Sequence, residues 1–180
     1  MTLTFPMKAA ELLPHKPPML LLDDCTAFDG ETVEGRTVLS GNCALFETEE
    51  GRYGSWILLE LMAQAVGLYA GLTKRQSGES PKIGFLLGTR KFEAAVAELT
   101  KGTEVTIRAK CVYFADKTLP SQFECTAMTG GKVIGTASLN RKPNRMNHRA
   151  EFGISLKKAW WGCGAASALM EAILAFAKEN

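Results

Sequence analysis

The residues from 54 to 72, GSWILLELMAQAVGLYAGL, constrain the fold of this chain more than any other segment. Apart from Glu60 and Gln64, every residue in this stretch is apolar, aromatic or small. An apolar segment of this length without a polar stripe predicts a helix that other elements bury on all sides. The remainder of the chain must therefore supply a layer that can surround one long helix.

Two polar side chains interrupt this helix. Glu60 and Gln64 are four residues apart, so they lie on one helix face, one turn from each other. An ionised carboxylate costs several kcal/mol away from water unless it is paired or protonated. Because Leu58, Leu59 and Leu61 surround Glu60 in the sequence, we expect it to be buried and interpret it as a functional residue. For Gln64 two roles stay open, namely orienting Glu60 and satisfying buried backbone groups.

The segments that flank the helix have the pattern of an antiparallel sheet. Residues 104–114 and 121–129 alternate apolar and polar side chains, which indicates strands with one face toward water. The pair Asp29-Gly30 and the sequence TGGK at 129–132 are typical of hairpin turns. The sequence predicts six strands in all, at residues 18–28, 30–39, 82–96, 104–114, 121–129 and 132–140.

The order of these elements predicts an α+β fold. Residues 40–53 are polar and predict a loop, and the helix is expected from about Ser55 to Thr73, with Ser55 as its N-cap. Two strands therefore precede the helix and four follow it. A single sheet can bury such a helix only by curling around it.

Composition narrows the class of protein. A chain of 180 residues that is 46% hydrophobic and 22% charged is long enough and apolar enough for one globular domain. The net charge of +2, without a basic cluster, argues against a nucleic-acid partner. The five cysteines form no CxxC pair and have no neighbouring His, so we predict no metal site and a reduced, cytoplasmic protein. We also predict no membrane segment, because no apolar run reaches the length that spans a bilayer.

The chain changes character after residue 140. The stretch RKPNRMNHR is cationic, and it precedes a short strand pattern, a Gly-rich turn (WWGCGAAS) and an apolar helix pattern (ALMEAILAFAKE). We therefore predict a domain at residues 1–140 and a strand-turn-helix appendage at 141–180.

Three motifs resemble the hotdog-fold 3-hydroxyacyl-ACP dehydratases. They are LLPHKPPMLLLD at 12–23, LELMAQAVGLYAGL at 59–72 and KIGFLLGTRKFEAAVAELTKG at 82–102. The likeness runs from about Leu12 to Asn140. It points to the ApeP-like branch, which is associated with aryl polyene pigment assembly, with the FabZ-type dehydratases as more distant relatives. It implies a six-stranded antiparallel sheet wrapped around the central helix.

The same resemblance implies an assembly and a pathway. Two hotdog subunits, identical or different, pair edge to edge, and the active sites lie at their interface. The substrate is carried by an acyl carrier protein in fatty-acid or aryl polyene type synthesis, and we predict no cofactor.

The reaction implied is elimination of water from a 3-hydroxyacyl thioester to give a trans-2-enoyl thioester. In the family, the helix carboxylate at the position of Glu60 acts on the leaving hydroxyl, and apolar surroundings favour the protonated form of a carboxyl. Free N–H groups at the start of the helix, at Ser55 and Trp56, are suited to the thioester oxygen. Gln64 would then hold the Glu60 carboxyl in orientation.

The general base is where the sequence departs from the family pattern. FabZ-type enzymes carry a His in a Gly-His-Phe-Pro motif before the helix, whereas the corresponding stretch here, NCALFETEEGRYGSW, contains no His. The two histidines of the chain are His15 and His148. In the family, the acyl chain of the substrate binds in a tunnel, and the resemblance places the LPHKPPM segment near the mouth of this tunnel, which makes His15 the candidate base. A purely structural His15 is the alternative.

The end of the chain resembles a different family. Residues 135–180 are similar to the middle of a GNAT N-acetyltransferase, whose Gly-rich turn binds the acetyl-CoA pyrophosphate at a helix N-terminus. The signature maps onto Trp161 to Ala166, with Trp161 and Ala165 departing from it. Because the rest of that fold is missing, we expect no acetyl transfer.

Three other functions stay open at this point. A hotdog acyl-thioesterase would also direct a helix carboxylate at the thioester. A non-catalytic subunit of a dehydratase heterodimer would leave the missing His to its partner. Acetyl transfer is the remaining alternative.

Overall fold

The computed structural model describes residues 3–78, 84–114 and 121–143, with side chains outside the description at 84–87, 90 and 140–143. The elements in chain order are β1 (Met7–Lys8), η1 (Ala9–Glu11), β2 (Asp24–Phe28), β3 (Thr32–Val38), η2 (Gly41–Phe46), β4 (Arg52–Gly54), α1 (Ile57–Gln76), β5 (Gly84–Ala94), β6 (Glu98–Thr100), β7 (Glu104–Tyr113), β8 (Ser121–Thr129) and β9 (Lys132–Pro143).

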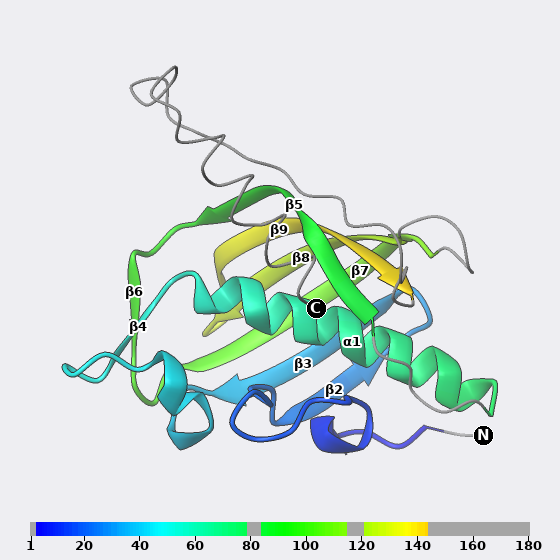
Figure 1. Ribbon diagram of the computed structural model, residues 1–180, viewed down its shortest axis with the longest axis horizontal. Helices are drawn as coiled ribbons and strands as arrows, with labels where there is room; N and C mark the ends of the chain where they lie inside the picture. Colours follow the sequence, from blue (N-terminus) through cyan, green and yellow to red (C-terminus); the bar gives the residue numbers. More distant parts are fainter. Residues whose placement is uncertain (1–2, 79–83, 115–120, 144–180) are drawn as a thin grey trace, which may run out of the picture. The chain divides into compact units, whose positions relative to one another are not determined.

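Seven of these strands form one antiparallel sheet in the order β1-β2-β3-β7-β8-β9-β5. The strands β4 and β6 pair separately. Figure 1 shows α1 lying across this sheet, where it packs on β3 and β7. The predicted α+β fold, with an antiparallel sheet around one long helix, is confirmed. The sheet has one strand more than predicted, because the two-residue β1 pairs with the start of β2.

The core lies between α1 and the sheet. Strands β7 and β8 alternate buried and more exposed residues, as predicted for a sheet with one face toward water. Two glycines of the sheet allow the helix to approach closely. A Cβ at Gly35 would lie 3.0 Å from Leu68 Cδ1, and one at Gly135 would lie 3.0 Å from Leu58 Cδ1. The buried residues of α1 are Ile57, Leu58, Leu61, Met62, Gln64, Ala65, Val66, Leu68, Tyr69, Ala70, Gly71 and Leu72.

The predicted strand at 18–28 is wrong in its first half, because β2 begins only at Asp24. Residues 16–20 form a turn in which the Lys16 carbonyl oxygen accepts hydrogen bonds from the N–H groups of Met19 and Leu20, at 2.9 and 3.1 Å. The next two N–H groups, of Leu21 and Leu22, donate to a side chain of α1. Their apolar side chains are buried, so the apolar run predicted burial correctly but not its backbone partner.

Three boundaries also differ from the prediction, two of them before and at the start of α1 and one at the end of β9. The segment 40–53, predicted to be a loop, contains η2 and the start of β4. The helix begins at Ile57, and its N-cap position is Trp56, without a capping side-chain hydrogen bond, so Ser55 is not the N-cap. The last strand, β9, continues to Pro143, three residues beyond the predicted end at Asn140.

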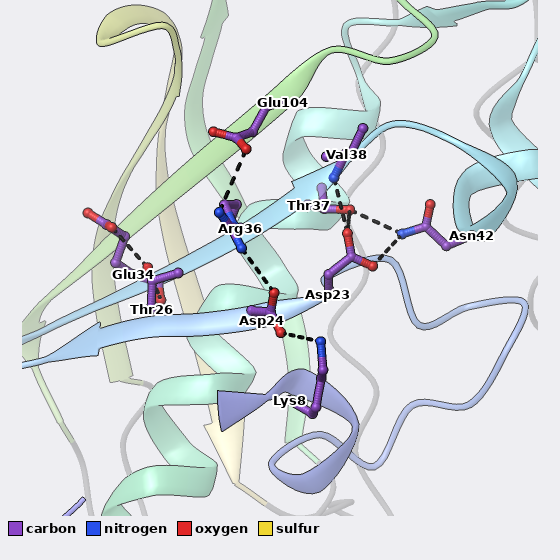
Figure 2. Close-up of polar contacts among 10 residues, drawn as sticks. All are labelled: Lys8, Asp23, Asp24, Thr26, Glu34, Arg36, Thr37, Val38, Asn42 and Glu104. Atoms are coloured by element: carbon purple, nitrogen blue, oxygen red, sulfur yellow. Dashed lines mark hydrogen bonds and ion pairs between the residues drawn. The ribbon is translucent and has the colours of Figure 1, made fainter. Parts of the chain in front are cut away.

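A buried carboxylate at the start of β2 is held by two cations. Asp24 Oδ1 accepts a hydrogen bond from Lys8 Nζ at 2.8 Å, and Asp24 Oδ2 accepts one from Arg36 Nη2 at 3.3 Å (Figure 2). The hydrogen bond from Lys8 is the main cause that holds the pKa of Asp24 below its ordinary value. These bonds join β1, β2 and β3, so Asp24 has a structural role.

The neighbouring Asp23 forms hydrogen bonds with the end of β3 and the start of η2. Its carboxylate accepts hydrogen bonds from Thr37 Oγ1 at 2.9 Å, from the Val38 N–H at 3.1 Å and from Asn42 Nδ2 at 3.1 Å (Figure 2). Each donor is neutral, and Thr37 is fully buried. The Asp23 side chain therefore connects the turn before β2 to the start of η2.

The predicted strand-turn-helix at 141–180, including Trp161 to Ala166, lies outside the described residues apart from the end of β9. Its resemblance to a GNAT N-acetyltransferase stays untested by the structure. None of the helices described has the length and apolar content of a membrane span.

Candidate active site

The first turns of α1 bring Glu60 and Gln64 together as their spacing predicts. Gln64 is fully buried, and its Nε2 donates a hydrogen bond to Glu60 Oε1 at 2.9 Å. Glu60 is half-buried, so the predicted enclosure of this carboxyl is wrong. Leu58 in the same turn is fully buried, whereas Leu59 and Ala63 are half-buried as well, so Glu60 lies on the face of α1 that the described elements cover less. The carboxyl is held through Oε1, and Oε2 has no hydrogen-bond partner among the described residues.

Gln64 has both of the roles that the sequence left open. Besides the bond to Glu60, its Nε2 donates to the Met19 carbonyl oxygen at 2.7 Å. Its Oε1 accepts from the N–H groups of Leu21 and Leu22, at 2.9 and 3.2 Å. Two donor hydrogens and two acceptor lone pairs are the full capacity of a carboxamide. Gln64 is thus completely satisfied, and it connects the turn at residues 16–22 to Glu60.

His15 lies in the segment between η1 and β2, which packs against α1. Two glycines of the helix make room for the start of this segment. A Cβ at Gly71 would overlap the Leu12 carbonyl oxygen, and one at Gly67 would lie 2.7 Å from Leu13 Cδ2. The segment therefore approaches the helix more closely than larger helix residues would allow.

The His15 ring is half-buried, and its Nδ1 atom is buried without a hydrogen-bond partner among the described residues. Buried ring nitrogens are normally paired, so this atom calls for a partner that the described residues do not supply. No hydrogen bond joins His15 to Glu60 in the described part of the chain. Their segments are connected instead through Met19, whose carbonyl oxygen accepts from Gln64.

The start of α1 offers different N–H groups from those predicted. The Ser55 N–H donates to the Ala97 carbonyl oxygen at 2.9 Å, so the prediction that it is free is wrong. Within the described residues, the N–H groups of Trp56 and Ile57 have no hydrogen-bond partner. Unpaired N–H groups at a helix N-terminus attract an oxygen that carries negative charge. The pair available for such an oxygen is therefore Trp56 and Ile57.

The indole of Trp56 covers the entry to the helix. The side chain is 55% exposed, and its ring meets Phe46 edge-on at a centroid separation of 5.4 Å. A Cβ at Gly54 would overlap the indole Nε1, so this position has to be glycine for Trp56 to lie as it does. An exposed indole beside the free N–H groups gives the site an apolar rim.

The loop before α1 is fixed by a second carboxylate. Glu47 accepts hydrogen bonds from Lys101 Nζ at 2.8 Å and from the Tyr53 hydroxyl at 3.0 Å. The hydrogen bond from Lys101 is the main cause that lowers the pKa of Glu47, and burial raises the pKa of Tyr53 to about 12. Tyr53 therefore remains a neutral donor at physiological pH, and its single hydroxyl hydrogen is shared between Glu47 and the Ser40 carbonyl oxygen, which lies 3.2 Å away.

Glu60 differs from these structural carboxylates, because no Lys, Arg or His forms an ion pair with it in the part of the chain described. Among the same residues, no group of three or more His, Cys, Asp or Glu side chains could hold a metal ion. The groups that surround Glu60 and can act in chemistry are therefore the Gln64 amide, the free helix N–H groups and the segment that carries His15.

Sequence reasoning missed the backbone partners of Gln64. Residues 19–22 are apolar and were predicted to be a strand, so nothing marked their N–H and carbonyl groups as part of a site. It also missed Asn42, whose Nδ2 donates to the Leu21 carbonyl oxygen at 2.9 Å. Asn42 is an ordinary loop residue in the sequence, and no local signal could have linked it to α1.

Comparisons with known proteins place this geometry in a family. The ApeP dehydratase model of the ApeP-like family matches residues 7–150. The dehydratase heterocomplex ApeI:P from Xenorhabdus doucetiae contains a chain with 26% sequence identity and a TM-score of 0.73, and the match covers 78% of this chain and 93% of that one.

Two more distant structures share the hotdog fold alone. An HP0420 homologue from Helicobacter felis is 8% identical with a TM-score of 0.58, over 81% of this chain and 93% of that one. A hypothetical thioesterase with coenzyme A from Streptococcus pneumoniae is 13% identical with a TM-score of 0.50, over 66% of this chain and 82% of that one. The family match, by contrast, covers most of the chain, and the chain therefore belongs to the ApeP-like dehydratase family.

Proposed function

We propose that this protein is a subunit of a 3-hydroxyacyl-ACP dehydratase, in which Glu60 is the acid that protonates the leaving hydroxyl. The observation that carries the proposal is that only one oxygen of the Glu60 carboxyl accepts a hydrogen bond among the described residues. Gln64 occupies Oε1 at 2.9 Å, and no cation in the described residues pairs with the carboxyl. A carboxyl held in this way can carry a proton on its other oxygen and donate it to a substrate.

The elimination of water needs one group that takes a proton and one group that gives a proton. A base removes a proton from the carbon next to the thioester carbonyl, and Glu60 gives its proton to the hydroxyl on the following carbon. The carbon–oxygen bond breaks, water leaves, and a trans double bond forms. The N–H groups of Trp56 and Ile57 are placed at the helix start to stabilise charge on the thioester oxygen.

His15 is the candidate base within this chain. Its buried and unpartnered Nδ1 supports the assignment, whereas the absence of a hydrogen bond to Glu60 favours a second possibility. In that second possibility the base comes from a different hotdog subunit. The similarity to a chain of the dehydratase heterocomplex ApeI:P supports it. The acyl carrier protein as substrate carrier, and synthesis of the fatty-acid or aryl polyene type, belong to the same proposal.

One experiment separates these readings. The purified protein is incubated with a 3-hydroxyacyl-ACP, alone and together with a second hotdog dehydratase subunit, and the acyl group is followed by mass spectrometry. Loss of water by the protein alone supports a complete site with His15. Loss of water only in the mixed sample supports a heterodimer subunit, and release of free acid instead would show a thioesterase. No conversion in either sample would contradict the proposal.

A further inference from the structure

A continuous chain of hydrogen bonds joins Asn42 in η2 to Glu60 in α1. Asn42 Nδ2 donates to the Leu21 carbonyl oxygen at 2.9 Å, and the Leu22 N–H donates to Gln64 Oε1 at 3.2 Å. The Leu21 carbonyl and the Leu22 N–H belong to one peptide group. Gln64 Nε2 then donates to Glu60 Oε1 at 2.9 Å. The chain therefore consists of three amide groups in series and ends on the candidate acid.

The direction of this chain is fixed by its neighbours. Gln64 Oε1 faces the N–H groups of Leu21 and Leu22, which can only donate. Gln64 Nε2 faces the Met19 carbonyl oxygen, which can only accept. Exchanging the oxygen and nitrogen of the Gln64 amide would therefore break three hydrogen bonds to the backbone. The nitrogen has to point at Glu60.

The far end of the chain is oriented as well. Asn42 Oδ1 accepts a hydrogen bond from the Ser40 hydroxyl at 3.1 Å, and Asn42 Nδ2 faces the Leu21 carbonyl oxygen and the Asp23 carboxylate. Reversing the Asn42 amide would place Oδ1 against the Leu21 carbonyl oxygen and the Asp23 carboxylate, and neither of these can donate to it. All three amide groups thus point their N–H ends toward Glu60.

Amide groups connected in this way polarise one another. A hydrogen bond accepted by the oxygen of an amide makes its N–H a stronger donor, and each such bond strengthens the next by about 10–30%. The last donor in the chain acts on Glu60 Oε1. That oxygen is held as an acceptor, and the acid proton is directed to Oε2, the oxygen that Gln64 does not occupy.

We infer that Asn42 is a positioning residue for the dehydratase reaction, which acts on Glu60 through the Leu21–Leu22 peptide and Gln64 and keeps the acid proton on Oε2. The inference rests on the proposed function only for its catalytic consequence. The hydrogen-bond relay itself is a property of the folded chain. Asn42 touches neither substrate nor the reacting atoms in this scheme.

A purely structural role for Asn42 is the competing explanation, because Asn42 Nδ2 also contacts Asp23 Oδ1 and Thr37 Oγ1, each at 3.1 Å. The matched pair of variants is therefore Asn42→Leu and Thr37→Val. Both remove hydrogen bonds from the same cluster and keep the number and branching of the side-chain heavy atoms. Only Asn42→Leu removes the donor to Leu21, and Thr37→Val leaves the path to Glu60 intact. Asn42→Ala replaces Asn42→Leu if the latter does not fold.

The first readout is the side-chain NH₂ resonance of Gln64, measured by NMR on the full-length protein without substrate. In Asn42→Leu the proton bonded to Glu60 is expected to move upfield, because its donor is less polarised. In Thr37→Val it is expected to stay near its wild-type position, although both variants lose stability. An unchanged resonance in Asn42→Leu, or an equal change in both variants, would overturn the inference.

The second readout is kinetic. Asn42→Leu is expected to lower kcat by about two- to tenfold with little change in KM, because the relay acts on the orientation of Glu60 and not on substrate binding. Thr37→Val is expected to retain the wild-type kcat. Equal kcat losses in both variants would show that Asn42 is only structural. If the wild-type protein dehydrates nothing, either alone or with a second hotdog subunit, the proposed function fails, and the NMR comparison still decides the relay.

Discussion

Asp24 in β2 and Glu60 in α1 are two carboxylates that the structure treats in opposite ways. Asp24 is buried and accepts hydrogen bonds from the cations Lys8 and Arg36. Glu60 is half-buried and accepts one from the neutral amide of Gln64. The cations fix Asp24 in its ionised form, and the hydrogen bond from Lys8 is the main reason that its pKa is lowered.

This difference separates a carboxylate that holds the fold from one that is available for chemistry. A group locked as an anion by cations cannot give up or take a proton near neutral pH. A group held on one oxygen by a neutral donor keeps its other oxygen for a substrate. Substituting each residue in turn therefore tests the comparison directly.

The largest effect is expected from Glu60→Gln. The substitution keeps the shape of the side chain and an oxygen that can accept from Gln64, but removes the acidic proton. Dehydration should fall by about 10²- to 10⁴-fold, the usual scale for a general acid, with the melting temperature nearly unchanged. Turnover is measured in the assembly that is active with a 3-hydroxyacyl-ACP. Wild-type turnover by this variant would remove Glu60 from the mechanism.

His15→Ala should be as damaging if His15 is the base, again by about 10²- to 10⁴-fold. The fold should survive, because the His15 ring makes no hydrogen bond through its Nδ1. His15→Gln serves as the control, since it restores size without a basic nitrogen. Full activity in both variants would assign the base to a partner subunit.

Asp24→Asn is expected to show the reverse pattern, with lower stability and unchanged turnover. Losing the charge weakens two charge-assisted hydrogen bonds, which are partly screened because Lys8 and Arg36 are exposed. The free energy of unfolding should fall by about 1–2 kcal/mol, measured by urea denaturation. Glu98→Gln breaks the exposed pair with Arg52 and should cost less than about 0.5 kcal/mol. A similar loss in both variants would contradict the structural role of Asp24.

The stabilisation by Asp24 should also depend on pH in a defined direction. Its pKa in the folded protein lies below the ordinary value of 3.8, so the unfolded chain binds this proton first as pH falls. The contribution is fully present above about pH 4 and is lost as pH falls through 3.8 and then through the lower folded pKa. The difference in unfolding free energy between wild type and Asp24→Asn should therefore narrow below pH 4. A constant difference down to about pH 2 would be inconsistent with this linkage.

The smallest effect is expected from removing residues 146–180. The hydrogen bonds described at Asp24 and Glu60 all come from residues between Lys8 and Gln64. Ending the chain after Arg145 should leave turnover and oligomer size unchanged, whereas ending it after Asn140 removes the pairing of Arg141, Lys142 and Pro143 with β5 and should lower the melting temperature. Acetyl-CoA binding that disappears on truncation would instead support the acetyltransferase resemblance.

The sequence by itself determined the parts of this protein that rest on local patterns. The apolar segment at 54–72 predicted the helix, its lack of a polar stripe predicted burial on all sides, and the flanking strand patterns predicted that a sheet buries it. The spacing of Glu60 and Gln64 predicted their contact, because residues four apart on a helix always lie side by side. The hairpin at Asp29-Gly30 followed from the turn residues, and Gly30 has a φ of 96° there.

Only the tertiary structure decided what those side chains touch beyond the helix. Gln64 bonds to the N–H of Leu21, 43 residues earlier in the chain, and the path to Asn42 runs through a single peptide group. Side chains that bond to backbone groups so far away leave no periodicity and no spacing to detect. The same bonds explain why residues 19–22 are not a strand. Their N–H groups donate to Gln64 or to the Lys16 carbonyl oxygen, so they do not donate to a neighbouring strand. Local chemistry therefore marked Glu60 as the candidate acid, whereas the fold alone determined which of its oxygens Gln64 leaves without a hydrogen bond.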